Sequence, residues 1–319
     1  MRHTISTIFT SITSMRNPDG DSGPRMIRSR TRLVCATLAA AAILGKAATV
    51  GAQEADTTRL KFMLSVPDLR SIIAPSNFFR GAPGASSGSP LAFGPDWGDA
   101  FVGAGYQNST RGIKQPSGTI TPNSRSDGTV SAGFGLGDGR RAVSVQVVAT
   151  SLSTVRAGLF QLTAYSFQLS RMLGNTSAVA IGVEDAFTIG GDPGSGPGGD
   201  GTDSWYAVAS KVFLLRPASS DVFKALTVSG GIGNGRFRSL SDVTANRQGV
   251  NAFGSASLLV TGQLSVIADY AGQDLNLGLS LIPFANFPVV FTPAMADVTR
   301  TASRTPRFEL GVGIGMHFD

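Results

Sequence analysis

The chain has 319 residues, of which 42% are hydrophobic and only 15% are charged. Soluble domains carry roughly 25% charged residues, so a helical soluble enzyme is disfavoured, and the 40 glycines favour short strands and turns. The formal net charge is +6, but residues 1–52 hold seven basic and two acidic groups, which leaves 20 basic and 19 acidic groups in residues 53–319. This nearly neutral body has no basic run, so we expect no nucleic acid partner.

Residues 1–52 are predicted to contain a signal peptide that follows an over-extended start. The basic segment "MIRSRTR" begins at Met26, which we take as the true start, and the apolar stretch "LVCATLAAAAILG" follows it. Small residues before Gln53 predict signal peptidase cleavage near Ala52. The apolar stretch is shorter than the roughly 20 residues of a membrane-spanning helix. Cys35 lies inside it, so the mature chain is expected to have no thiol for disulfides or metal binding.

Residues 53–98 form an irregular segment before the first predicted strand. Pro67 and Pro75 interrupt "LKFMLSVPDLRSIIAPSNFF" and exclude a long helix. A stretch rich in Gly, Pro and Ser follows. The sequence leaves two interpretations open, a periplasmic arm or a plug in the lumen of a barrel.

Residues 99–319 show the period-two alternation of β-strands. In "TVSAGFGL", for example, Val130, Ala132, Phe134 and Leu136 alternate with small or polar residues. The phase slips near Ala164–Tyr165 and Glu184–Asp185, which suggests β-bulges. Twelve strands are predicted, with centres near residues 103, 132, 147, 165, 182, 209, 230, 255, 267, 279, 294 and 313.

The connections between these strands differ in length and polarity. Those after the first, fifth and seventh strands (108–127, 190–203 and 238–249) are long, and those after the second, fourth and eighth are tight. The non-apolar face is mostly Gly, Ser, Ala and Thr, with few of the Lys and Glu residues of a water-exposed sheet. An exported chain of this kind predicts an all-β fold, a transmembrane antiparallel up-and-down β-barrel of about 12 strands (range 10–14). Arginine should therefore impair assembly more at Leu279 or Val312 than at Ser280 or Gly313.

The C-terminal segment "RFELGVGIGMHFD" resembles the sorting signal of bacterial outer-membrane β-barrel proteins. Its apolar row consists of Phe308, Leu310, Val312, Ile314, Met316 and Phe318. The resemblance implies that the barrel-insertion machinery reads this strand and that the protein lies in the outer membrane, in contact with its lipid. The family usually ends on the aromatic residue, whereas this chain ends on Asp319.

A shorter segment, "VIADYAGQDLNLGLSLIPF" at residues 266–284, is similar to barrels of the YjbH type, which are associated with exopolysaccharide export. An acidic-aromatic-Gly turn before an Asn-Gly alternating strand carries this similarity. It covers under a tenth of the chain.

Several motifs match catalytic or binding patterns but lack their structural context. "GASSG" at 84–88 has the form of a nucleophile elbow, yet it lies in a linker-like stretch, and His317 is the only histidine beyond the signal. "GSGPGG" at 194–199 contains Pro197 and precedes no helix. Asp192, Asp200 and Asp203 could bind calcium, but a single repeat copy cannot build a β-roll. We therefore expect no enzymatic activity, no catalytic or metal residues and no cofactor.

Five charged residues are the candidates for lining a lumen: Lys211, Asp269, Asp297, Arg307 and Glu309. They either pair with one another as structural charges or tune the ion preference of a pore. The leading hypothesis is a non-enzymatic outer-membrane β-barrel that passes small solutes or polymer, or that has a structural surface role. The alternative is a secreted soluble β-rich binding protein.

Overall fold

The computed structural model describes residues 83–109, 117, 126–152, 154–155, 158–190, 203–215, 222–245, 247–284, 287 and 289–318. They fall within one compact unit, Gly51–Asp319. The predicted signal peptide with Met26 and Ala52, residues 53–82, the motif at 194–199, Asp192, Asp200 and Asp319 lie outside the described residues.

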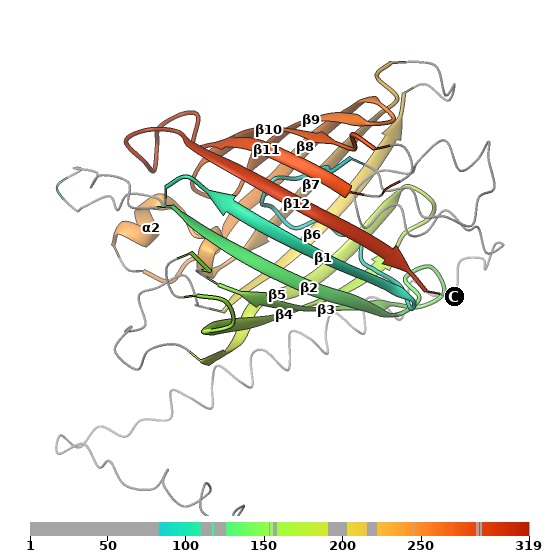
Figure 1. The fold of residues 1–319 in the computed structure, drawn as a ribbon, viewed down its shortest axis with the longest axis horizontal. Coiled ribbons are helices and arrows are strands. Elements are labelled where there is room, and N and C mark those ends of the chain that lie inside the picture. Colours follow the sequence, from blue (N-terminus) through green and yellow to red (C-terminus); the bar gives the residue numbers. More distant parts are fainter. Residues whose placement is uncertain are drawn as a thin grey trace, which may run out of the picture. The chain divides into compact units, whose positions relative to one another are not determined.

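Twelve antiparallel strands form a closed barrel in which neighbours in sequence pair and β1 pairs with β12 (Figure 1). The strands are β1 (Asp99–Gln107), β2 (Asp127–Gly137), β3 (Ser144–Ser151), β4 (Leu162–Met172), β5 (Ser177–Gly190), β6 (Ser204–Leu214), β7 (Ala225–Gly233), β8 (Asn251–Thr261), β9 (Leu264–Tyr270), β10 (Leu275–Leu281), β11 (Val289–Ala296) and β12 (Arg307–His317). The predicted fold class is confirmed. Closure pairs both sides of every strand and leaves no open edge.

The connections at the two ends of the barrel differ in length. The turn rim, where β1 begins and β12 ends, carries short turns such as 138–143, 173–176 and 262–263. The opposite end, the loop rim, carries the long connections 108–126, 191–203 and 234–250. The last of these contains η4 (Gly235–Phe237) and α2 (Leu240–Thr244). Among the described residues, no helix combines the length and the hydrophobicity needed to cross a bilayer.

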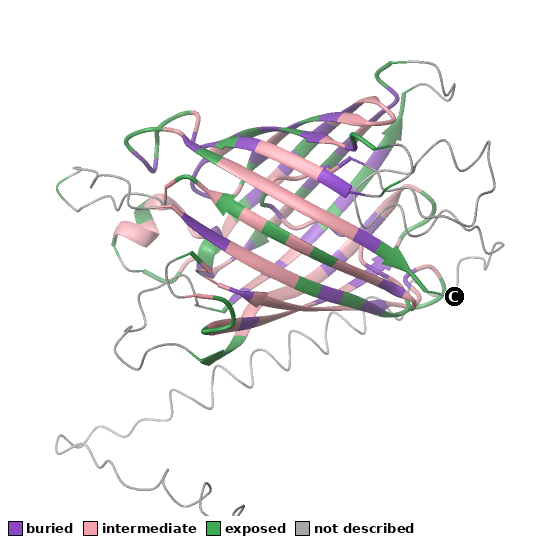
Figure 2. Ribbon diagram, in the orientation of Figure 1, coloured by how far each residue is buried: buried purple, intermediate pink, exposed green. Residues whose placement is uncertain are grey.

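More buried and more exposed residues alternate along much of the strands (Figure 2), because successive side chains point to opposite faces of a sheet. The outward rows are apolar and include the exposed residues Val102, Phe134, Val228, Val266, Leu277 and Leu279. The inward rows are mostly small or polar, as in Asn276, Gly278 and Ser280 of β10. In β12, Arg307 is buried on the inner face, and Phe308 and Met316 are exposed on the outer face.

The expected phase slips occur at a β-bulge between β4 and β5. Tyr165 pairs with Phe187, whereas Phe167 pairs with Val183, so the register shifts between them. Asp185 lies inside the bulge with a left-handed backbone (φ 51°). The extra residues on β5 shift the register locally, and the barrel remains closed.

The faces of β6 differ from those expected. Its apolar residues Tyr206, Val208 and Val212 are buried on the inner face, and Lys211 is exposed on the outer face. Lys211 therefore does not line the lumen. The inner row is apolar because another part of the chain packs against it inside the barrel.

Candidate functional site

Residues 83–98, the lumen segment, run inside the barrel before the chain enters β1. Near the turn rim, the Gly84 N–H donates to Ser280 Oγ at 2.6 Å. The segment then reaches the loop-rim end of β9 and returns, and the Ala92 N–H donates to Ser210 Oγ at 2.9 Å. At the turn rim, the Trp97 N–H donates to the Gly137 carbonyl at 2.8 Å.

Close approach of the lumen segment to the wall explains a glycine on the inner row of β2. A Cβ atom built on Gly135 would lie 2.3 Å from the carbonyl oxygen of Asp96. A contact this short between non-bonded atoms excludes any side chain there. The inward-facing row of β2 is thus small at Gly135 because the lumen segment occupies the adjacent space.

Asp269 on β9 binds the loop-rim part of the lumen segment. This fully buried carboxylate accepts hydrogen bonds from the backbone N–H groups of Ser87, Gly88 and Ser89 at 3.0–3.1 Å. It also accepts from the hydroxyls of Ser86 (2.5 Å) and Ser89 (2.6 Å). Successive N–H groups that converge in this way form a nest for an anion. The "GASSG" motif is thus an ordered carboxylate-binding turn.

Apolar contacts fill the lumen on the β5–β8 side. Ala92 and Phe93 of the lumen segment pack in one buried cluster with residues of the inner wall: Ala178, Ala180, Tyr206, Val208, Val212, Ala225, Phe237, Phe253 and Leu259. Phe237 and Phe253 stack with their ring centroids 4.4 Å apart, and Tyr206 meets Phe253 edge-on at 6.2 Å. This cluster is the hydrophobic core that holds the lumen segment to one side.

On the other side, a cavity of about 860 Å³, the polar chamber, separates the lumen segment from the wall of β1–β5, β11 and β12. The lining includes these hydroxyl and amide side chains: Ser86, Ser87, Gln107, Thr129, Ser131, Gln146, Thr150, Ser166, Gln168 and Thr292. Its carboxylates are Asp127, Glu184, Asp185 and Glu309, and its described lining includes no Lys, Arg or His. The glycines of β1 and β12 leave this volume open.

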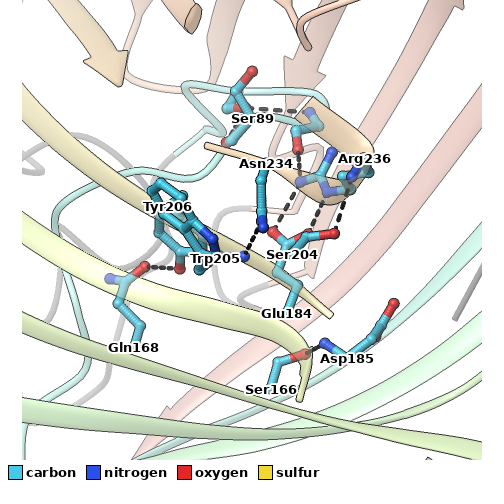
Figure 3. Close-up of polar contacts among 12 residues, drawn as sticks. Ser89, Ser166, Gln168, Glu184, Asp185, Ser204, Trp205, Tyr206, Asn234 and Arg236 are labelled. Atoms are coloured by element: carbon cyan, nitrogen blue, oxygen red, sulfur yellow. Dashed lines mark hydrogen bonds and ion pairs between the residues drawn. The ribbon is translucent and has the colours of Figure 1, made fainter. Parts of the chain in front are cut away.

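Arg236 of η4 joins the lumen segment to the wall beside the polar chamber (Figure 3). Its guanidinium donates through Nε and Nη2 to the Glu184 carboxylate and through Nη2 to the Gly88 carbonyl at 2.8 Å. It also stacks on Phe237 at 4.2 Å. Partial burial lowers the pKa of the Arg236 guanidinium, but Glu184, with smaller contributions from Asp269 and Tyr206, outweighs this and raises the pKa above its usual value, so the guanidinium stays charged.

The charged residues predicted to line the lumen do not all lie on the inner face of the barrel. Asp269, Arg307 and Glu309 lie on the inner face, and Arg307 pairs with Asp274 at 3.3 Å and with Glu309 at 3.5 Å. Asp297 instead follows β11 in the β11–β12 connection, where its carboxylate accepts from the backbone N–H groups of 301–303. It stabilises that loop and is absent from the described lining of the chamber.

Sequence reasoning missed Glu184, Arg236, Asp274 and Gln168 as lumen residues. Glu184 and Asp185 do interrupt an apolar strand, which was a usable signal for polar groups facing inward. Arg236, by contrast, follows β7 in a loop, and only the fold brings it to Glu184, 52 residues away in sequence.

Exposed aromatic side chains gather at both rims, which the sequence reading did not anticipate. Those at the turn rim are Trp97, Phe213, Phe223, Phe284, Phe287 and Phe318, and those at the loop rim are Tyr106, Phe160, Phe187, Tyr270 and Phe308. Tyr165 stacks on Phe187 with centroids 4.8 Å apart. Aromatic girdles at both edges of an apolar band are typical of barrels in a membrane.

His317 lies near the turn rim, where its Nδ1 is 2.7 Å from an Asp99 carboxylate oxygen. Within the described part of the chain, no group of three or more His, Cys, Asp or Glu residues is arranged to hold a metal ion.

These features define the class of the protein, a closed twelve-stranded antiparallel β-barrel with a segment of its own chain and a polar chamber in its lumen. No protein-family model matches the sequence, and no curated protein matches it. Among solved structures, the chain is similar to the outer membrane protein Omp33 of Acinetobacter baumannii, with 11% sequence identity and a TM-score of 0.36. The match covers 69% of this chain and 98% of the other.

Proposed function

We propose that this chain is a non-enzymatic outer-membrane β-barrel protein that passes small polar solutes through its lumen. The observation that carries the proposal is the outer surface of the barrel, an apolar band between two aromatic rims. Such a surface suits lipid, and a closed barrel satisfies its backbone hydrogen bonds without water. The C-terminal strand, with its resemblance to a sorting signal, suits recognition by the barrel-insertion machinery.

The lumen supports a restricted passage better than a wide pore. The lumen segment packs against the β5–β8 side, and the polar chamber occupies the remainder. Twelve strands lie between the eight whose interior side chains can fill and the sixteen that leave an aqueous channel. We propose that the lumen segment acts as a plug that limits passage.

The contacts of the "GASSG" segment, whose sequence resembles a nucleophile elbow, support the proposal of a non-enzymatic role. The hydroxyl of Ser86 in "GASSG" and that of Ser89, which follows the motif, both donate to Asp269. A nucleophilic serine would need a general base as its partner, whereas the Asp269 oxygen that Ser86 contacts already accepts from three backbone N–H groups.

Cell fractionation tests the location. The protein should partition with the outer membrane, require detergent for extraction and migrate faster on gels before boiling than after it. Recovery from the soluble periplasm or medium would contradict the proposal and favour a secreted binding protein.

Planar-bilayer recording tests the passage and the plug. The intact protein should show little or weak conductance, and deletion of 53–98 should raise it because the barrel wall begins at Asp99. Large steady conductance of the intact protein would contradict the plug. No conductance in either form would contradict a role in passage and favour a closed structural barrel.

A further inference from the structure

We propose that the polar chamber is a binding site for a small carbohydrate that carries no negative charge. This deepens the proposed function, on which it rests, by naming the class of solute that the lumen would hold. The chamber's volume of about 860 Å³ lies within the roughly 300–1,000 Å³ of small-molecule sites.

The lining suits a ligand with many groups that both donate and accept hydrogen bonds. Thr129, Ser131, Thr150 and Ser166 present hydroxyls from three successive strands, and Gln146 adds an amide. A hydroxyl offers one donor and two acceptor positions, so sugar hydroxyls can exchange hydrogen bonds with each of these groups. Phe93 and Phe101 add apolar surface for the C–H faces of a sugar ring.

Gln168 supplies an independent indication of a ligand. It is only 6% exposed and lies on the inner row of β4, in the chamber lining. Its Oε1 accepts from the Tyr206 hydroxyl at 2.7 Å (Figure 3), whereas its Nε2 is buried without a hydrogen-bond partner. A buried donor left unpaired is unfavourable. Nε2 is closed to solvent in this conformation, so the amide would turn toward the chamber for an acceptor oxygen on a ligand to pair it. A polyamine, which offers only N–H donors when charged, would not pair it.

Charge determines which carbohydrates fit. Asp127, Glu184, Asp185 and Glu309 face the chamber, and the described lining contributes no basic side chain. The neighbouring cations Arg236 and Arg307 are bound to carboxylates, Arg236 to Glu184 and Arg307 to Asp274 and Glu309. An anionic sugar would meet like charges in a partly desolvated site, which is unfavourable. Carboxylates can instead accept hydrogen bonds from the hydroxyls of a neutral sugar.

Ligand-observed NMR on the full chain in detergent tests the site, with glucose, maltose and glucuronate as probes. Glucose and glucuronate differ only in the carboxylate that replaces the C6 hydroxymethyl group. The neutral sugars should show saturation transfer, and glucuronate should bind at least tenfold more weakly. Equal binding of glucuronate, or no binding of either neutral sugar, would overturn the proposal.

A matched pair of variants tests the role of Gln168. Gln168→Met removes the free donor at similar length and should weaken maltose binding at least tenfold. Thr227→Val is the control, because Thr227 Oγ1 is also buried without a partner on the inner face but does not line the chamber. A Gln168→Met barrel that keeps heat-modifiable mobility and binds maltose as the wild type does would overturn the assignment.

The test separates this inference from the proposed function. A heat-modifiable outer-membrane barrel that binds no sugar would refute the sugar site alone. If Gln168→Met fails to assemble, the comparison of glucose with glucuronate on the wild type still decides the question.

Discussion

Leu279 and Ser280 are adjacent in β10, yet their surroundings differ completely. Leu279 is 43% exposed on the outer face. Ser280 is fully buried, and its hydroxyl binds both Gly84 N–H (2.6 Å) and Thr292 Oγ1 (3.0 Å). From the sequence alone, every inward-facing position is expected to tolerate arginine better than an outward-facing one. The lumen segment makes Ser280 an exception.

Arginine substitutions test this difference between faces. Leu279→Arg should destabilise the assembled barrel by about 2–4 kcal/mol, the cost of a cation facing the bilayer midplane. Gly313→Arg should be tolerated, because a Cβ atom there meets only the Val102 carbonyl oxygen at 3.7 Å and the side chain can enter the chamber. The fraction that migrates as a folded barrel before boiling measures both. An equal loss of folded barrel in the two variants would indicate that both faces of the sheet pack against protein, as in a soluble protein.

Ser280→Arg should impair assembly like Leu279→Arg, although for a different reason. The longer side chain would displace Gly84 and leave a buried arginine beneath the lumen segment. Deleting residues 83–92 in the same chain should relieve part of the defect, and no relief would contradict the steric explanation.

Arg307 illustrates how burial sets the strength of an ion pair. Its side chain is 7% exposed, and it pairs with Asp274, which is 1% exposed. Arg307→Met should destabilise the barrel by about 3–5 kcal/mol because it leaves buried carboxylate charge uncompensated. Arg247→Met removes a pair with Asp242 in which the arginine is 65% exposed, and it should cost less than about 1 kcal/mol. Denaturant titration of the refolded protein measures both, and similar values would contradict this account.

At the scale of elements, β6 shows that an apolar row does not by itself identify the lipid face. Tyr206, Val208 and Val212 alternate as an outward row would, yet they face Phe93 inside the barrel. Lys211 lies on the outer face three residues from the turn-rim end of the strand, near the Phe213 ring. A lysine near the edge of a membrane can extend its ammonium group to the headgroups. Period-two alternation shows which residues of a strand share a face, but it does not show which face points into the barrel.

The connections between elements predict the orientation of the barrel. With twelve strands both ends of the barrel chain emerge at the turn rim, and we expect that rim to face the periplasm. An epitope tag in 190–203 should be labelled on intact cells, and a tag in 173–176 should be labelled only after permeabilisation. The reverse pattern would mean that the barrel inserts with the opposite orientation.

For the whole molecule, the position of the lumen segment depends on contacts at both rims. Asp269 binds residues 86–89 at the loop-rim end, and the Trp97–Gly137 hydrogen bond anchors the other end. Without the Asp269 contacts, residues 86–89 would lose most of their hold at the loop rim, while Ala92 and Phe93 would stay packed in the cluster on the β5–β8 side.

Asp269→Asn should therefore loosen residues 86–89 of the lumen segment at the loop rim. Each buried donor left unpaired costs about 1–3 kcal/mol, and the amide can accept fewer of the five hydrogen bonds than the carboxylate does. We expect larger or more frequent conductance events in planar bilayers. Asp297→Asn is the control, because that carboxylate binds only its own loop among the contacts described. Identical conductance traces from the wild type and Asp269→Asn would contradict the conclusion that Asp269 holds residues 86–89 in place.

The sequence by itself determined the strands, their number and most of their connections, because alternation and turn residues are local properties. It also identified the small inward row and the bulge between β4 and β5. The path of residues 83–98, the direction of β6 and the pairs Asp269–Ser89, Arg236–Glu184 and Gln168–Tyr206 were decided only by the tertiary structure. Each of these pairs joins residues at least 38 positions apart. Closure of the barrel brings such residues together, and no local pattern records which of them will meet in the lumen.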